Sequence, residues 1–275
     1  MNIDRMDLDG VGSAAGIAAR IHELLPDMPL PVPVEELCHQ LDIISIEELQ
    51  TDGFEAMLVT DEHKSQGAIV HARGRMTART RFSIAHELGH FLIPSHRPSA
   101  AGSMQCSLEH LLKSDVKAKD RRRRIEAEAN RFAAHLLMPP ARVRKAILAS
   151  EDRLEVIIAM ADDFGVSKEA MARTWIEHHS EPVAIVITQH GRIARYYRGE
   201  DFPWLDVRPR DAIPDGSAAV DCDHETGCYT DFEEVEADVW LDERAATKVL
   251  ALDEQVLFQA RGFAMVLLVA DLDEE

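Results

Sequence analysis

The chain has 275 residues, of which 46% are hydrophobic, and a formal net charge of −19. This composition is typical of a globular protein with one large or two ordinary domains, and it argues against a disordered chain. No apolar run is long enough to span a bilayer, and the N-terminus lacks the features of a secretory signal. Since the four cysteines are also scattered, we expect a cytoplasmic protein that does not bind a membrane.

The negative charge is concentrated toward the C-terminus. Between Gly199 and Glu275 there are 21 acidic and 5 basic residues. Such a surface repels phosphate backbones, so we expect that the chain as a whole does not bind nucleic acid directly. Solubility is the simplest function for these charges.

Hydrophobic periodicity predicts helices and a small sheet in the N-terminal part. Apolar residues recur at helical spacing over 13–25, and a short helix is expected over 34–41 after a proline-rich connector. Period-two alternation predicts three strands, over 43–46, 55–59 and 67–71. Their lengths fit a small antiparallel sheet.

The next predicted helix, 77–92, carries two histidines four residues apart, His86 and His90, with Glu87 between them. Residues four apart on a helix are stacked neighbours, so both imidazoles can reach one metal ion. Glu87 then lies beside the metal without binding it, as does the general base in the H-E-x-x-H motif of zinc hydrolases. The helix is apolar nearly all round and should be buried, where two rings and a carboxylate need a partner such as a metal. Gly89 in its interior is tolerable if another element passes close by.

A catalytic zinc site needs a third protein ligand. Residues 94–120 are predicted to be rich in loops, and the helix expected over 120–138 offers two glutamates. At about 100° per residue, Glu126 falls on the inward stripe with Asn130 one turn later, whereas Glu128 falls on the charged, solvent-facing side. We therefore expect Glu126 to be the third ligand and Asn130 to orient a ring.

In the C-terminal part the sequence first predicts three helices and then strands, in which apolar and polar residues alternate. Helices are expected over 141–149, 154–164 and 168–177, and the pattern changes near Glu181. The predicted strands of the tail are a hairpin and four later candidates, over 183–188, 192–198, 218–222, 235–241, 255–259 and 264–270. The chain is thus predicted to be an α+β protein, with a metal-binding domain over 1–179 and a β-rich, acidic domain over 180–275.

Two segments resemble the ImmA/IrrE zinc metallopeptidases, a family of zincins whose third ligand is a glutamate. They are residues 81–92, around the histidine pair, and residues 126–139, and they occur in the order typical of the family. The resemblance implies a mainly helical, zincin-like catalytic domain with a small sheet. It also implies that Zn²⁺ binds His86, His90 and Glu126.

The same resemblance implies a reaction and a substrate. Glu87 would be the general base of a zinc endopeptidase. Family members typically act on a partner transcriptional repressor of the helix-turn-helix type, in stress responses or in the induction of mobile elements. Some relatives carry a sensor domain of the GAF type at their C-terminus, and residues 180–275 could be a divergent version of it.

The main alternative is a non-catalytic protein in which zinc stabilises the fold and regulation works through binding a partner repressor. Glu87 favours the hydrolase, because a structural zinc site has no use for a base beside the metal. For the donor that stabilises the oxyanion, His71, His96 and tyrosine or arginine residues of the tail are equal candidates.

Two further patterns have a structural and a functional interpretation. Residues 161–171 resemble a helix-turn-helix core with glycine at the turn, but the helix that would read DNA carries as many acidic as basic residues. A helical hairpin that packs on the catalytic domain is therefore the favoured interpretation. Cys222 and Cys228 are interpreted as part of a loop between strands, because no second cysteine pair completes a zinc site.

Overall fold

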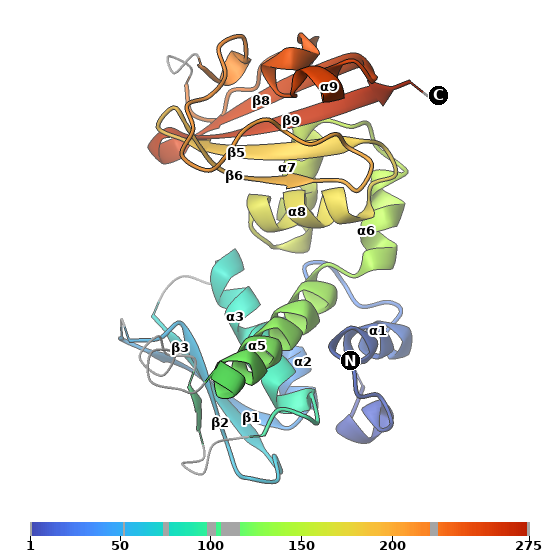
Figure 1. Cartoon of the computed structure of the whole chain (residues 1–275). Helices are drawn as coiled ribbons and strands as arrows, with labels where there is room; N and C mark the ends of the chain where they lie inside the picture. The colour runs from blue at the N-terminus through green and yellow to red at the C-terminus, as the bar shows by residue number, and fades with distance from the viewer. Residues whose placement is uncertain are drawn as a thin grey trace. The chain divides into compact units, whose positions relative to one another are not determined.

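The structure, a computed structural model, describes residues 2–51, 53–73, 77–97, 103–105, 116–220 and 225–273. These residues form two compact units, both drawn in Figure 1. The first unit comprises Met1–Pro140 and Ala161–Ser167, and the second comprises Ala141–Met160 and Lys168–Glu275. Compactness does not establish independent folding, so the division into domains 1–179 and 180–275 stays a prediction.

The helices of the first unit gather around one long helix, α5. Contacts join α5 to α3 and to α1, and Figure 1 shows α5 crossing α3. Side-chain caps start two of the helices: the oxygen of Ser13 accepts from the backbone N–H of Gly16, and that of Thr77 accepts from Thr80. The helix bounds are Arg5–Leu8 for the 3₁₀ helix η1, Ala14–Leu24 for α1, Val34–Gln40 for α2, Ala78–Leu92 for α3 and Val116–Leu137 for α5.

Close packing of α3 on α5 depends on Gly89. A Cβ atom placed at Gly89 would lie 2.8 Å from Cδ1 and 3.3 Å from Cβ of Phe132 on α5. The Phe132 side chain is fully buried, so it has little room to move away. The close neighbour that the sequence led us to expect at this glycine is therefore an aromatic side chain.

A sheet lies against α3 in the first unit. In the described residues its strand order is β1-β3-β2-β4, and α3 contacts β2 and β3. β3 and β4 both run antiparallel to β2, whereas β1 runs parallel to β3, so the prediction of an antiparallel sheet is wrong for β1. Alternation identifies a strand but not its partner, and β4 falls in a stretch that was predicted as loop. The bounds are Ile43–Leu49 for β1, Ala56–Thr60 for β2, Gly67–Ala72 for β3 and Ser103–Gln105 for β4.

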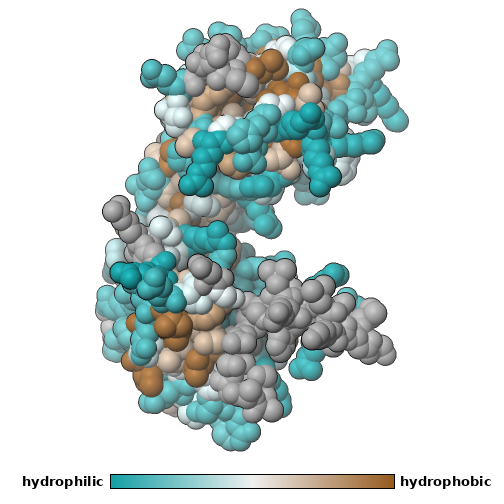
Figure 2. Space-filling view, turned by 90° about the vertical axis from the view of Figure 1, so that its left-hand side faces the viewer, coloured by the Kyte–Doolittle hydropathy of each residue, from teal (hydrophilic) through white to brown (hydrophobic). Residues whose placement is uncertain are grey.

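The second unit is built on a five-stranded antiparallel sheet with the order β6-β5-β9-β8-β7. The predicted hairpin is confirmed as β5 and β6. The bounds are Val183–Gln189 for β5, Arg192–Arg198 for β6, Glu233–Glu234 for β7, Val249–Gln259 for β8 and Phe263–Leu272 for β9. Over much of the face that Figure 2 shows, hydrophilic residues cover this unit.

Both faces of the five-stranded sheet are covered, which explains why β5 reads as a continuous apolar run. On one face α8 (Lys168–His178) contacts β5 and β6. On the other, side chains from the long connections, including Phe202 and Trp240, join the core. Two further helices precede α8: α6 (Pro140–Ile147) and α7 (Leu154–Phe164).

The helix-turn-helix-like segment is a helical hairpin, as favoured, with Gly165 at φ +63° in its turn. The expectation that it packs on the catalytic domain is wrong for α8, because the buried residues of α8 belong to the second unit and face its sheet. Glu169 at the start of α8 accepts a hydrogen bond of 2.6 Å from the hydroxyl of Tyr197 on β6. The helix that would read DNA in a helix-turn-helix protein therefore packs on the sheet of the second unit.

Two predicted strands of the tail, over 218–222 and 235–241, are not strands in their described residues, which exclude 221 and 222. Within 218–222, Ala218–Val220 is a 3₁₀ helix, and within 235–241, Ala237–Val239 is another. Apolar residues of 235–241 pack into the core although they belong to a loop between strands. The Trp240 side chain is buried, and its Nε1–H donates to Glu254 Oε2 at 2.6 Å. Period-two hydrophobicity cannot separate such a connection from a strand.

The predicted α+β class, with a helical N-terminal part and a β-rich C-terminal part, is confirmed. Within the part of the chain that the structure describes, no helix combines the length and apolarity needed to cross a bilayer. Cys222 lies outside the described residues, and the likeness of the tail to a GAF-type domain stays a prediction.

We predict that Gly89→Ala destabilises the protein. Alanine is the better helix former by about 1 kcal/mol, but its methyl group would clash with Phe132, and overpacking of this kind costs about 1–3 kcal/mol. Urea unfolding measures the difference. Gly12→Ala is the control, because a Cβ at Gly12 has no atom within 4 Å. A Gly89→Ala variant that is more stable than the unchanged protein by the full helix-propensity gain of about 1 kcal/mol would contradict the packing argument.

Candidate metal centre

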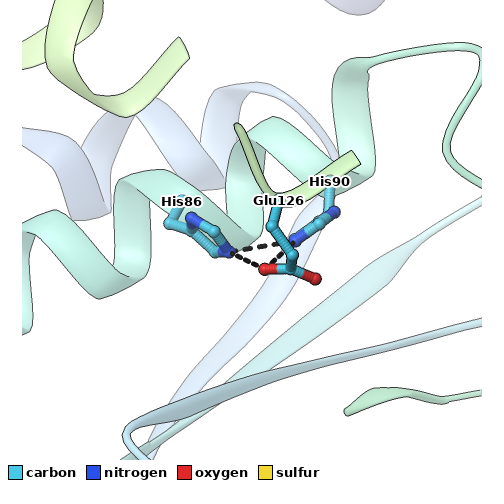
Figure 3. A group of neighbouring side chains, drawn as sticks. All are labelled: His86, His90 and Glu126. Atoms are coloured by element: carbon cyan, nitrogen blue, oxygen red, sulfur yellow. Dashed lines mark hydrogen bonds and ion pairs between the residues drawn. The ribbon is translucent and has the colours of Figure 1, made fainter. Parts of the chain in front are cut away.

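The two histidines project from the buried helix α3 toward one point. His86 and His90 are one turn apart, with side-chain exposures of 12% and 1%. The Glu126 side chain reaches the same point from α5 and is 36% exposed. Figure 3 shows both ring Nε2 atoms and one carboxylate oxygen facing one another. Contact between α3 and α5 thus brings together three residues that are far apart in sequence.

The distances between these atoms fit a tetrahedral metal ion. The Nε2 atoms of His86 and His90 are 3.0 Å apart, and Glu126 Oε2 lies 3.3 Å from the first and 3.7 Å from the second. Zinc–nitrogen bonds of about 2.0–2.1 Å give a tetrahedron with edges of about 3.3 Å. Two imidazoles and one carboxylate are also a ligand set that catalytic zinc sites use. The residues present therefore fit a zinc ion.

Asn130 holds the His86 ring from behind. Asn130 lies one turn after Glu126 on α5, and its Oδ1 is 2.9 Å from Nδ1 of His86. An amide oxygen only accepts, so the Nδ1–H of His86 donates and Nε2 keeps its lone pair for a metal. The predicted contact of Asn130 with a ring is present, although Asn130 is exposed and does not lie on a buried stripe of α5.

Glu87 lies beside the three donor atoms, in a buried position. Its side chain is 2% exposed, and its Oε2 has no hydrogen-bond partner in the described residues. Burial raises the pKa of Glu87 to about 7, partly offset by the charge of His86 and a backbone hydrogen bond from Leu58. A carboxylate with an unused oxygen and a pKa near neutrality suits a general base.

Burial also favours a neutral His90. It lowers the pKa of this ring to about 4, against the opposing effect of a hydrogen bond to Glu126. A histidine must be neutral to bind a metal. Near neutral pH, the ring is therefore in the form that a metal requires.

A cavity of about 640 Å³ is lined by two of the three donor residues, His86 and Glu126. Its walls include His86, Glu87, Glu126 and the half-buried rings of Phe54 and Phe82. An extended peptide could reach the metal position through this opening. The mixed apolar and polar walls are typical of a substrate-binding cleft.

Residues 49–175 match the model of the IrrE N-terminal-like domain, Peptidase_M78. This segment, 127 of the 275 residues, is similar to that domain. It contains all four predicted site residues, and the predicted resemblance is confirmed over its length. No curated protein sequence matches the chain.

A solved structure with a similar fold is a Mycobacterium tuberculosis transcriptional regulator. The similarity covers 94% of this chain and 87% of that one, with a TM-score of 0.52 and 14% sequence identity. At this identity the likeness shows the fold alone. It extends over both units of the chain.

The IrrE-like domain brings together His86, His90, Glu126 and Glu87, whose functions as ligands and base stay predictions. Neither histidine considered for the oxyanion lines the described part of the cavity. His71 is buried with its Nδ1 3.1 Å from the carbonyl of Ala72, and His96 lies behind His90. We withdraw both as oxyanion donors.

Lys64 supports the candidate metal centre. The sequence did not predict this function, because Lys64 lies in a polar loop. Its ammonium group is buried and donates to the carbonyls of His90 and Ile93 at 2.7 and 2.8 Å. These carbonyls belong to the last turn of α3, where helices leave acceptors unpaired. Lys64 thereby fixes the end of the helix that carries the rings.

We predict that Lys64→Met lowers the free energy of unfolding by about 1–3 kcal/mol, because two buried carbonyls lose their donor. Urea unfolding of the metal-free protein measures it. Lys145→Met is the control, since Lys145 is exposed on α6. The assignment of Lys64 as a helix cap fails if the two variants are equally stable.

Proposed function

We propose that the chain is a zinc-dependent endopeptidase that cleaves a partner repressor of the helix-turn-helix type. One observation carries the enzymatic part: a buried carboxylate with an unused oxygen, Glu87, stands beside three converging metal-binding atoms. A purely structural zinc site needs the three donors but gains nothing from Glu87, whose burial is costly.

The mechanism assigns each residue a task. A zinc ion held by His86, His90 and Glu126 would lower the pKa of a water molecule and polarise the scissile carbonyl. Glu87 accepts the proton of the attacking water and delivers it to the leaving amine. Asn130 keeps His86 oriented, and the rings of Phe54 and Phe82 offer apolar contact to the peptide in the cleft.

The choice of substrate rests on the resemblance to the IrrE-type metallopeptidases, and the charge of the chain is compatible with it. Repressors of the helix-turn-helix type carry basic surfaces that bind DNA. A chain with a net charge of −19 attracts such a surface at long range and speeds its encounter. We extend the proposal to the setting typical of the family, which is a stress response or the induction of a mobile element.

We predict that Glu87→Gln retains zinc but slows cleavage about 10²–10⁴-fold, because the amide cannot accept the proton. The zinc-loaded protein is incubated with purified helix-turn-helix repressors from the same organism, and fragments are followed by gel and mass spectrometry. Glu62→Gln is the control, because the Glu62 side chain is 85% exposed. This variant should cleave the repressor at the normal rate.

Two results would reject the peptidase. If Glu87→Gln cleaves as fast as the unchanged protein, the base is assigned wrongly. If neither protein cleaves the repressor but both bind it, the alternative holds, in which the protein regulates by binding.

A further inference from the structure

A buried row of three side chains leads from His90 away from the cleft. Nδ1 of His90 lies 3.0 Å from Nδ1 of His96, and Nε2 of His96 lies 2.9 Å from Glu128 Oε2. His96 is fully buried, and the Glu128 side chain is 37% exposed. Glu128 was predicted to face solvent, and its contact with His96 corrects that prediction.

The protons along this row can be assigned from donor and acceptor chemistry. An ionised carboxylate only accepts, so His96 Nε2–H donates to Glu128. In a neutral His96 ring Nδ1 is then the acceptor, and the bond to His90 must come from His90 Nδ1–H. That leaves the lone pair of His90 on Nε2, the atom that faces His86 and Glu126.

Without Glu128, the opposite arrangement becomes equally available. His96 would be free to carry its proton on Nδ1 and donate to His90 Nδ1. His90 would then carry its own proton on Nε2, where it blocks metal binding. The Glu128 carboxylate thus determines, through the His96 ring, which nitrogen of the His90 ring carries the proton.

We propose that His96 and Glu128 are positioning residues, which hold His90 in the tautomer and orientation that metal binding requires. The inference rests on the metal site of the proposed function. It also explains why two glutamates two residues apart on α5 both matter. Glu126 faces Nε2 of His90 directly, whereas Glu128 lies on another side of the helix and reaches Nδ1 through His96.

The test compares two substitutions at Glu128 by zinc affinity, measured in competition with a chelator. Glu128→Leu removes the acceptor, and we expect zinc binding about 10–100-fold weaker. Glu128→Gln keeps a carbonyl oxygen that can accept from His96, so we expect an affinity within about threefold of the unchanged protein. Glu23→Leu is the control, because Glu23 is an exposed helix carboxylate that pairs with Arg20, and it should bind zinc normally.

A second readout separates positioning from a general structural effect. The ¹⁵N chemical shifts of the His90 ring in the metal-free protein report which nitrogen carries the proton. We expect Nδ1–H in the unchanged protein and in Glu128→Gln, and a substantial share of Nε2–H in Glu128→Leu. Thermal unfolding of the metal-free variants checks that each is folded.

Should Glu128→Leu fail to fold, His96→Leu replaces it, because it removes the acceptor for His90 with a side chain of suitable size; weaker zinc binding is again expected. Unchanged zinc affinity in the folded variant would overturn the inference, as would an equal loss in Glu128→Gln and Glu128→Leu. Failure of the unchanged protein to bind zinc would instead reject the proposed function.

Discussion

The structure depends on one electrostatic constraint, the convergence of two imidazole nitrogens and one carboxylate oxygen within hydrogen-bonding distance of one another. With their ring protons held on Nδ1, the two histidines turn lone pairs toward each other and toward a negative charge. Such an arrangement is repulsive unless a cation, either a metal ion or a proton, lies between the atoms. The rest of the first unit can be understood as the scaffold that keeps these three groups together.

Three features of the scaffold act on different parts of this cluster. Gly89 lets α5 approach α3 closely enough for Glu126 to reach the rings. Lys64 binds the last carbonyls of α3 and fixes the end of the helix. Asn130 and His96 contact the outer nitrogens of the two rings, so that each ring is held on both sides. Rigid support of this kind is what a catalytic metal site requires.

The three residues of the candidate metal centre were predictable because the position of each depends on the geometry of one helix. The spacing of His86 and His90 places them on one face, and the helical projection separates Glu126 and Asn130 from Glu128. The same projection failed for the environment of Glu128, because it describes a residue relative to its own axis. It cannot show that a loop residue, His96, packs against that side of α5.

Other features could not be predicted from the sequence for a similar reason. Lys64 and the parallel pairing of β1 depend on which segments become neighbours in space. The connection around Trp240 carries the alternation of a strand but covers the core as a 3₁₀ turn. Local patterns therefore predicted most of the elements and the convergence of His86, His90 and Glu126, whereas the residues that support this cluster required tertiary structure.

The central claim is that His86, His90 and Glu126 bind one zinc ion. X-ray absorption spectroscopy at the zinc edge, on protein purified with the metal it acquires in the cell, tests it most directly. If these three residues bind the ion, the spectrum shows one zinc per chain with only nitrogen and oxygen neighbours, at about 2.0–2.2 Å. A sulfur neighbour at about 2.3 Å, or protein without zinc that takes up none when it is supplied, would contradict the claim.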